Sequence, residues 1–161
     1  MPELSVRRAN PSDRPWVLEM VEREWHGPLI ERGDEFLDAR DLEADIAYQK
    51  GERVGLSTLL IASTFIEVVT LNSFRQGQGI GSALLKAAET TAKELGLEDV
   101  RLFTTNDNLH ALAFYQKRGF RLWKIHRDTI TRARIQKPEI PLIGRNGIEI
   151  ADEIELRLSL H

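Results

Sequence analysis

The sequence predicts a mixed α/β fold in which an antiparallel meander comes first and strand–helix alternation follows. Three observations support this prediction. Apolar runs joined by tight turns occupy residues 46–71, as is typical of neighbouring antiparallel strands. Two segments of helical periodicity follow, and each ends at a glycine, Gly96 or Gly119. Residues 154–160 alternate apolar and polar side chains, which indicates a last strand with one buried face.

The individual elements follow from local patterns. A first helix starts at Pro11-Ser12-Asp13 and ends at Gly27-Pro28, and Trp16 and Trp25 on it are expected to pack in the core. The predicted strands, about seven, are residues 4–9, 46–49, 54–61, 65–71, 100–104, 120–125 and 154–160. The remaining predicted helices are residues 79–95, 109–118 and 129–135.

Two connections have weaker patterns. Arg32-Gly33-Asp34-Glu35 indicates a turn, and residues 35–42 fit either a short helix or a loop. The acidic connection over residues 28–42 could border a substrate site, but we expect it to be solvated surface. Residues 138–150 contain two prolines and two glycines and are predicted to be mostly loop.

Composition narrows the class of protein. A chain of 161 residues fits one domain, residues 1–161, with 42% hydrophobic and 29% charged residues. The net charge of −3 gives no reason to expect nucleic acid or an anionic membrane as a partner. No stretch approaches the ~18 apolar residues of a membrane span, and no signal peptide is recognised. The absence of cysteine excludes disulfides and thiolate chemistry, and it fits a cytoplasmic location.

A glycine loop at residues 76–82 joins the apolar run 65–71 to a helical pattern. Glycine lets backbone N–H groups converge on an anion, and the helix N-terminus adds partial positive charge. The loop therefore predicts a site for a phosphate-bearing cofactor. The candidate donors are the amides of Gln76, Gly77, Gln78, Gly79, Ile80, Gly81 and Ser82.

Two common phosphate-binding motifs do not fit this loop. A P-loop requires a lysine after its last glycine, but Ser82 and Ala83 follow Gly81. A dinucleotide fingerprint requires glycine or alanine at its third position. Counting from Gly77 that position is Ser82, and counting from Gly79 it is Leu84.

A third motif does fit. Gln76-x-x-Gly79-x-Gly81 resembles the acetyl-CoA loop of the GNAT acetyltransferase superfamily, Q/R-x-x-G-x-G/A. Residues 108–120 resemble the second signature of that family, N-x-x-A-x-x-F-Y-x-x-x-G-F. The predicted order of elements also matches the GNAT fold, a central mixed sheet flanked by helices. The resemblance covers most of residues 4–125, and the segment 127–161 is less typical apart from its last strand.

The resemblance implies an acetyl-CoA-dependent N-acetyltransferase. Its acceptor would be a primary amine of a small molecule, an amino acid or a peptide or protein. The pantetheine arm of coenzyme A would run along Leu71, Asn72 and Ser73 like an added strand. Asn108 would bond this arm, cap its helix, or do both. Because the chain has no cysteine and no suitable serine motif, we expect direct attack in a ternary complex.

Acyl transfer to an amine needs a proton acceptor for the amine and a proton donor for the departing thiolate. Glu67 matches a position where some members of the family carry a general base, although an outward-facing glutamate is an equal alternative. Tyr115 matches a tyrosine that donates to the thiolate or bonds the sulfur, and the alternative is a packing aromatic. The backbone N–H of Leu71 or a neighbour would donate to the thioester carbonyl.

Several hypotheses stay open at this point. The basic residues between Arg127 and Lys137 form either a solvated surface or a cover over the acceptor site that recognises an anion. His126 is a second candidate for substrate contact, and the spacing of the four histidines predicts no metal site. Many members of the family pair subunits through late strands, so a homodimer is an expectation. The alternative functions are an acyl-CoA-binding protein without catalysis and a transferase with a different acyl-CoA donor.

Overall fold

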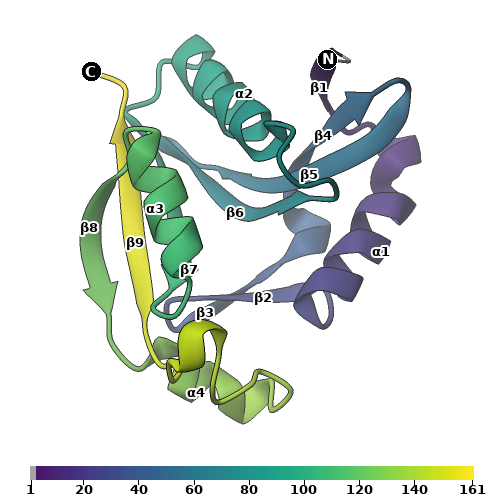
Figure 1. Ribbon diagram of the computed structural model, residues 1–161. Coiled ribbons are helices and arrows are strands. Elements are labelled where there is room, and N and C mark those ends of the chain that lie inside the picture. Colours follow the sequence, from purple (N-terminus) through teal and green to yellow (C-terminus); the bar gives the residue numbers. More distant parts are fainter. Residues whose placement is uncertain (1–2) are drawn as a thin grey trace.

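Seven strands form the central sheet of the computed structural model, which describes residues 3–161 (Figure 1). The strands are, in spatial order, β1 (Leu4–Arg8), β4 (Glu43–Gln49), β5 (Glu52–Ile61), β6 (Phe65–Ser73), β7 (Asp99–Thr105), β9 (Glu153–Ser159) and β8 (Arg121–His126). All neighbours are antiparallel except β6 and β7, which are parallel. The predicted mixed α/β fold with an antiparallel meander is therefore confirmed.

The described residues form four α-helices: α1 (Arg14–Trp25), α2 (Ile80–Glu94), α3 (Leu109–Lys117) and α4 (Thr129–Gln136). A short 3₁₀ turn, Pro11–Asp13, precedes α1, and Asn10 and Asp13 form a capping box there. Figure 1 shows α2 and α3 in front of the sheet and α4 at its lower end. Within residues 3–161, no helix has the length and apolar character needed to cross a membrane.

Neighbouring residues of β6 point into different hydrophobic clusters on the two faces of the sheet. Val68 belongs to a cluster that contains residues of α2 and contacts α3, whereas Val69 packs against a cluster that contains residues of α1. The helices α2 and α3 thus cover one face, and α1 covers the other. Trp16 and Trp25, expected in the core, are partly buried at the edge of the α1 cluster.

The strands β6 and β7 separate part-way along their length. Their pairing runs from Phe65 with Asp99 to Val68 with Leu102, although β6 continues to Ser73 and β7 to Thr105. A β-bulge lies at the point of separation, because Thr58 pairs with Thr70 but Leu59 pairs with Val68. Beyond it, β6 carries backbone groups on its β7 side that no ladder with β7 satisfies.

Residues 28–42 differ from the prediction. They form a hairpin of β2 (Leu29–Arg32) and β3 (Glu35–Asp38), followed by a 3₁₀ turn at Ala39–Asp41. The predicted turn between Arg32 and Glu35 is confirmed, but the expectation of a helix or loop after it was wrong for β3. Ile30 of β2 is almost fully buried, so the hairpin packs on the domain and is not a solvated connection.

Candidate active site

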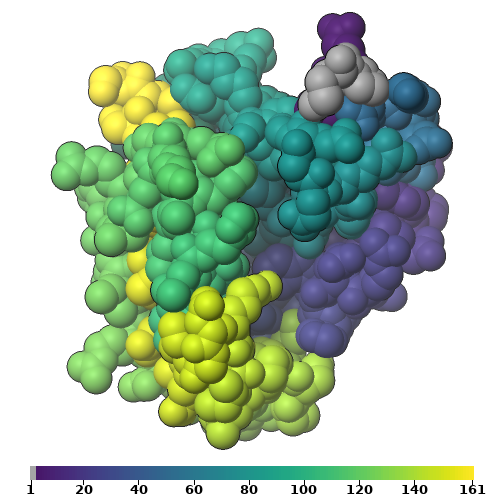
Figure 2. Space-filling view, viewed as in Figure 1, coloured from purple at the N-terminus to yellow at the C-terminus, as the bar shows by residue number. Residues whose placement is uncertain are grey.

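A cavity of about 400 Å³ lies where β6 and β7 separate. It is lined by residues of both faces of the sheet, including Glu67 from β6 and Tyr115 from α3. The end of α1, the strand β2 and residues between Ile130 and Glu153 supply most of the remaining wall. Figure 2 shows the surface hollowed between α3, the segment near residue 145 and α1. The site therefore runs through the sheet.

The side chain of Glu67 is buried in this cavity wall, with 1% of its surface exposed. Burial raises its pKa to about 7, against the opposing effect of the Arg32 guanidinium, whose Nη1 lies 3.4 Å from Oε1. Oε1 has no hydrogen-bond donor within residues 3–161. A carboxylate with a pKa near 7 can accept a proton at neutral pH and return it afterwards.

Tyr115 contributes a hydroxyl from the opposite side of the sheet. Its ring makes edge contacts with Phe114 at 5.5 Å and Phe120 at 5.9 Å between ring centroids. Burial raises the pKa of its phenol to about 12, so the hydroxyl keeps its proton at neutral pH. A protonated phenol with no partner among the described residues is available as a hydrogen-bond donor.

The predicted pantetheine residues divide into two groups. Leu71, Asn72 and Asn108 line the cavity. Asn108 caps α3 by accepting a hydrogen bond from the Ala111 N–H at 3.1 Å, as one of its two predicted roles required. Ser73 is exposed outside the cavity wall, and its hydroxyl donates to the Arg75 carbonyl.

The glycine loop lies outside the cavity wall, at the start of α2. Gly79 is the N-cap of α2 with φ of 73°, and Gly77 has φ of 70°. A Cβ on either would meet open space, as a backbone that receives a ligand requires. Gly81 differs, because a Cβ there would lie 3.1 Å from the Phe114 ring. The lack of a side chain at Gly81 therefore allows α2 to pack closely on α3, and the predicted role of its backbone N–H toward phosphate stays a prediction.

A cation beside the loop was missed from the sequence. Arg118, at the end of α3, donates from Nε to the Ser82 hydroxyl at 2.7 Å and stacks over the Phe114 ring at 3.5 Å. Its guanidinium therefore lies next to the predicted phosphate site. The helical periodicity of residues 109–117 carries no sign of this contact, because the contact joins residues 36 positions apart.

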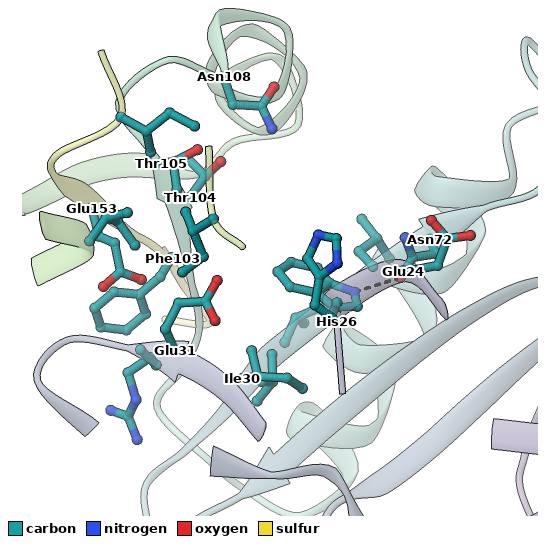
Figure 3. A pocket seen from close by; sticks show the side chains of 18 of the residues that line it. Glu24, His26, Ile30, Glu31, Asn72, Phe103, Thr104, Thr105, Asn108 and Glu153 are labelled. Atoms are coloured by element: carbon teal, nitrogen blue, oxygen red, sulfur yellow. Dashed lines mark hydrogen bonds between the residues drawn. The ribbon is translucent and has the colours of Figure 1, made fainter. Parts of the chain in front are cut away.

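Sequence reasoning also missed most of the acceptor side of the cavity. Figure 3 shows Glu24 and His26, beside the predicted Asn72, on one side of the pocket and Glu31, Phe103 and Glu153 on the other. These residues follow no common motif, since they come from the end of α1 and from β2, β6, β7 and β9. His126, the second candidate for substrate contact, instead pairs with Glu155 at 2.9 Å and lies outside the cavity wall.

The segment after β8 wraps the cavity and is fixed by its basic residues. The Lys137 ammonium donates to the carbonyls of Trp25 and Leu29 and to the Glu31 carboxylate, at 2.8 to 2.9 Å. Arg134 donates to backbone carbonyls, including that of Ile150 at 2.7 Å. Ile140, Pro141, Arg145 and Ile150 of this segment line the cavity. The hypothesis that the basic residues recognise an anion is wrong for Lys137 and Arg134, whose charges bind the protein itself.

No cluster of three or more histidine, cysteine, aspartate or glutamate side chains suited to a metal ion occurs in the part of the chain that the structure describes.

The family model for the acetyltransferase (GNAT) family matches residues 10–120. The chain belongs to this family. The "Uncharacterized protein YxbD" of Bacillus subtilis (strain 168) is 38% identical over 141 residues, which cover 87% of this chain and 89% of the relative. The "Uncharacterized N-acetyltransferase YvbK" of the same organism is 32% identical over 130 residues, 79% of each chain.

The structure resembles solved members of the family. A GNAT family acetyltransferase from Elizabethkingia anophelis, solved with acetyl-CoA bound, has a TM-score of 0.70 at 22% identity, with 98% of each chain covered. The likeness confirms the GNAT fold.

Proposed function

We propose that this protein is an acetyl-CoA-dependent N-acetyltransferase that acetylates a primary amine. One observation carries the proposal: Glu67, a carboxyl with a pKa of about 7, and Tyr115, a phenol with a pKa of about 12, line one cavity where β6 separates from β7. The first group suits removal of a proton near neutral pH, and the second suits donation of one. Both are needed when an ammonium becomes an amide and a thiolate leaves.

The residues of the cofactor side fit coenzyme A. The backbone of β6 beyond Val68 is unpaired toward β7, which leaves room for a pantetheine arm to bond to Leu71 and Asn72 as an added strand would. At the start of α2, the loop from Gln76 to Ser82 offers backbone N–H groups, and the Arg118 guanidinium adds positive charge. The cosubstrate brings an activated acetyl group as a thioester.

The steps assigned to the protein are proton transfers and hydrogen bonds. Glu67, directly or through water, accepts a proton from the acceptor ammonium, and the neutral nitrogen then attacks the thioester carbon. The N–H of Leu71 or a neighbour donates to the carbonyl oxygen as negative charge develops. As the C–N bond forms and the C–S bond breaks, Tyr115 donates its proton to the departing sulfur. The nitrogen loses its second proton as the amide forms, and this proton returns to Tyr115 through water. The proton held by Glu67 leaves to solvent.

The size of the cavity limits the acceptor. A volume of about 400 Å³ is at the lower end of the ~300–1,000 Å³ typical of small-molecule sites. The reacting amine therefore belongs to a small group that enters this space, such as a small-molecule amine or a single terminal residue of a peptide.

A coupled pair of measurements tests the function. Acetyl-CoA should raise the melting temperature of the protein, because a ligand that binds only the folded state stabilises it. A panel of amines, amino acids and short peptides should then release free thiol from acetyl-CoA in the presence of the enzyme. Binding without thiol release from any amine would support the alternative of a non-catalytic acyl-CoA-binding protein. Release from another acyl-CoA but not from acetyl-CoA would support the alternative donor.

A further inference from the structure

The acceptor side of the cavity contains three buried or nearly buried carboxylates that differ in their counter-ions. Glu31 pairs with the Lys137 ammonium at 2.9 Å, and Glu67 lies 3.4 Å from the Arg32 guanidinium. Glu153 has only 3% of its surface exposed and makes no salt bridge with any residue in the range 3–161. Among the three, Glu153 is thus the carboxylate whose charge no side chain of the described residues balances.

The contacts of Glu153 hold it in place without neutralising it. The Gly33 N–H, in the turn between β2 and β3, donates to Oε1 at 2.8 Å. The Thr129 side chain supplies a further hydrogen bond. Neutral donors fix the direction of a carboxylate, but the cost of burying its charge falls fully only when a cation joins it. In the folded protein this cost raises the pKa of Glu153 to about 7, with the charges of Glu31 and Glu67 adding to the effect.

A second and independent observation points to a cationic ligand in the same place. Oε1 of Glu67, a side chain that is 1% exposed, has no hydrogen-bond donor among the described residues. Both Glu67 and Glu153 line the cavity, and the charge of Glu67 contributes to the raised pKa of Glu153. The cavity therefore presents one buried acceptor atom that has no hydrogen-bond donor, although the Arg32 guanidinium lies 3.4 Å away, and one buried carboxylate that has no cation among the described residues.

The cations in and near the cavity already face carboxylates. Lys137, outside the cavity wall, is bound to Glu31 and two carbonyls. Arg32 lies between Glu67 and Glu35 at 3.4 and 3.5 Å, although its buried Nε has no hydrogen-bond acceptor among the described residues. Arg145 lies 3.8 Å from Asp107 and is mostly exposed. An acceptor carrying a carboxylate would bring a fourth negative charge to the end where Glu31 and Glu153 lie (Figure 3).

We propose that Glu153 binds a second cationic group of the acceptor, so that the substrate is a diamine or a longer polyamine with one amine at Glu67 and another at Glu153. The inference rests on the proposed acetyl transfer and names its substrate class. One ammonium loses a proton to Glu67 and is acetylated. The other stays protonated, pairs with Glu153 and sets the position of the first. Glu153 acts as a specificity residue and takes no part in bond making.

The experiment compares linear α,ω-diamines of two to six carbons with monoamines of equal length, using thiol release from acetyl-CoA. We expect kcat/KM at least tenfold higher for the best diamine than for its monoamine. Glu153→Gln should remove this preference by raising the KM for the diamine about tenfold or more relative to the KM for the monoamine. The glutamine oxygen can still accept the Gly33 N–H. Glu98→Gln, an exposed position outside the cavity, is the matched control and should change neither value.

A binding measurement keeps the inference testable apart from catalysis. 1,4-Diaminobutane should raise the melting temperature of the natural chain and of Glu98→Gln, but not that of Glu153→Gln. Equal use of diamines and monoamines by the natural chain would overturn the inference, as would a preference that survives in folded Glu153→Gln. Failure of every amine to release thiol would instead count against the proposed function itself.

Discussion

The cofactor side and the acceptor side of the cavity differ in how the chain builds them. The cofactor side uses two short stretches, residues 71–82 and 108–118, and it offers mainly backbone groups and helix ends. The acceptor side draws side chains from α1, β2, β7 and β9, and the segment after β8 closes it. Backbone recognition can be encoded in a local motif, whereas a wall of side chains depends on contacts between distant segments. Variants on the two sides should therefore fail in different ways.

The largest effect is expected at Tyr115, the proposed proton donor to the sulfur between the two sides. Tyr115→Phe should lower kcat by about 10²–10⁴-fold, the range typical of general acid catalysis, because the phenol proton is lost. The affinity for acetyl-CoA should stay within about twofold of the natural chain. The measurement is steady-state thiol release together with a melting-temperature shift.

The control for this variant is Tyr48→Phe, since the chain has only two tyrosines. Tyr48 accepts a hydrogen bond from Arg7 and lies outside the cavity. Unchanged turnover in Tyr115→Phe would remove its assigned acid role.

Glu67→Gln should lower kcat by about 10²-fold and flatten the pH profile. In the natural chain, kcat/KM should rise with pH up to about 7, since the deprotonated carboxylate is the base and its pKa is about 7. In the variant this rise should disappear. A rate–pH profile from pH 5 to 9 at saturating acetyl-CoA measures both effects, and a rise that persists unchanged in Glu67→Gln would contradict the assignment.

Lys137→Met should weaken the acceptor side selectively. The substitution leaves a buried Glu31 carboxylate and two carbonyls without their donor, which costs about 3 kcal/mol in the free energy of unfolding. We expect a higher KM for the acceptor and an unchanged dissociation constant for acetyl-CoA. Urea unfolding and isothermal titration provide the two readouts.

The double variant Glu31→Leu/Lys137→Met removes both partners and should recover part of the lost stability. If Lys137→Met weakened acetyl-CoA as much as the acceptor, the proposed division of the cavity into two sides would be wrong.

Gly79→Ala tests the cofactor side. Gly79 has φ of 73°, a conformation that costs a residue with a Cβ about 1–2 kcal/mol. If the loop relaxes to relieve this strain, its N–H groups turn away from the phosphate, and the affinity for acetyl-CoA should fall about tenfold. Gly96→Ala is a close control, because Gly96 has φ of 72° with open space around it and follows the opposite end of α2. An equal loss of affinity in both variants would point to strain in α2 and not to the loop.

The last prediction concerns how the free energy of unfolding changes with pH. Burial raises the pKa values of Glu67 and Glu153 to about 7 from an ordinary value of 4.5. Between these values the folded protein binds more protons than the unfolded chain, so the free energy of unfolding contributed by these groups falls as pH rises through this window. Denaturant unfolding at pH 5 and pH 8 should show that the free energy of unfolding falls less in Glu67→Gln and in Glu153→Gln than in the natural chain. A fall as large as in the natural chain would contradict these pKa values.

Much of the fold could be predicted because its signals are local. The glycine after each of α2 and α3, the meander turn at Lys50-Gly51 and the existence of β9 are properties of short windows, and all were found where the sequence indicated. The expectation that β9 has one buried face was wrong, because Glu153 and Glu155 on its other face are buried as well. The hairpin of β2 and β3 was not predicted, because strands of four residues are too short for a period to stand out. The position of β9 between β7 and β8 also could not be predicted from the order of the strands along the chain.

The candidate site divides in the same way. The sequence by itself determined the family signature, the glycine loop and the pair Glu67 and Tyr115, because these residues lie within or beside motifs whose spacing is fixed along the chain. Only the tertiary structure brought Glu31 and Glu153 to one end of a cavity, and only it gave Gly81 a packing role against Phe114. The pKa of Glu153 and the lack of a cation beside it depend on groups from several elements. Charge balance and burial are sums over neighbours in space, and a linear sequence does not contain those neighbours.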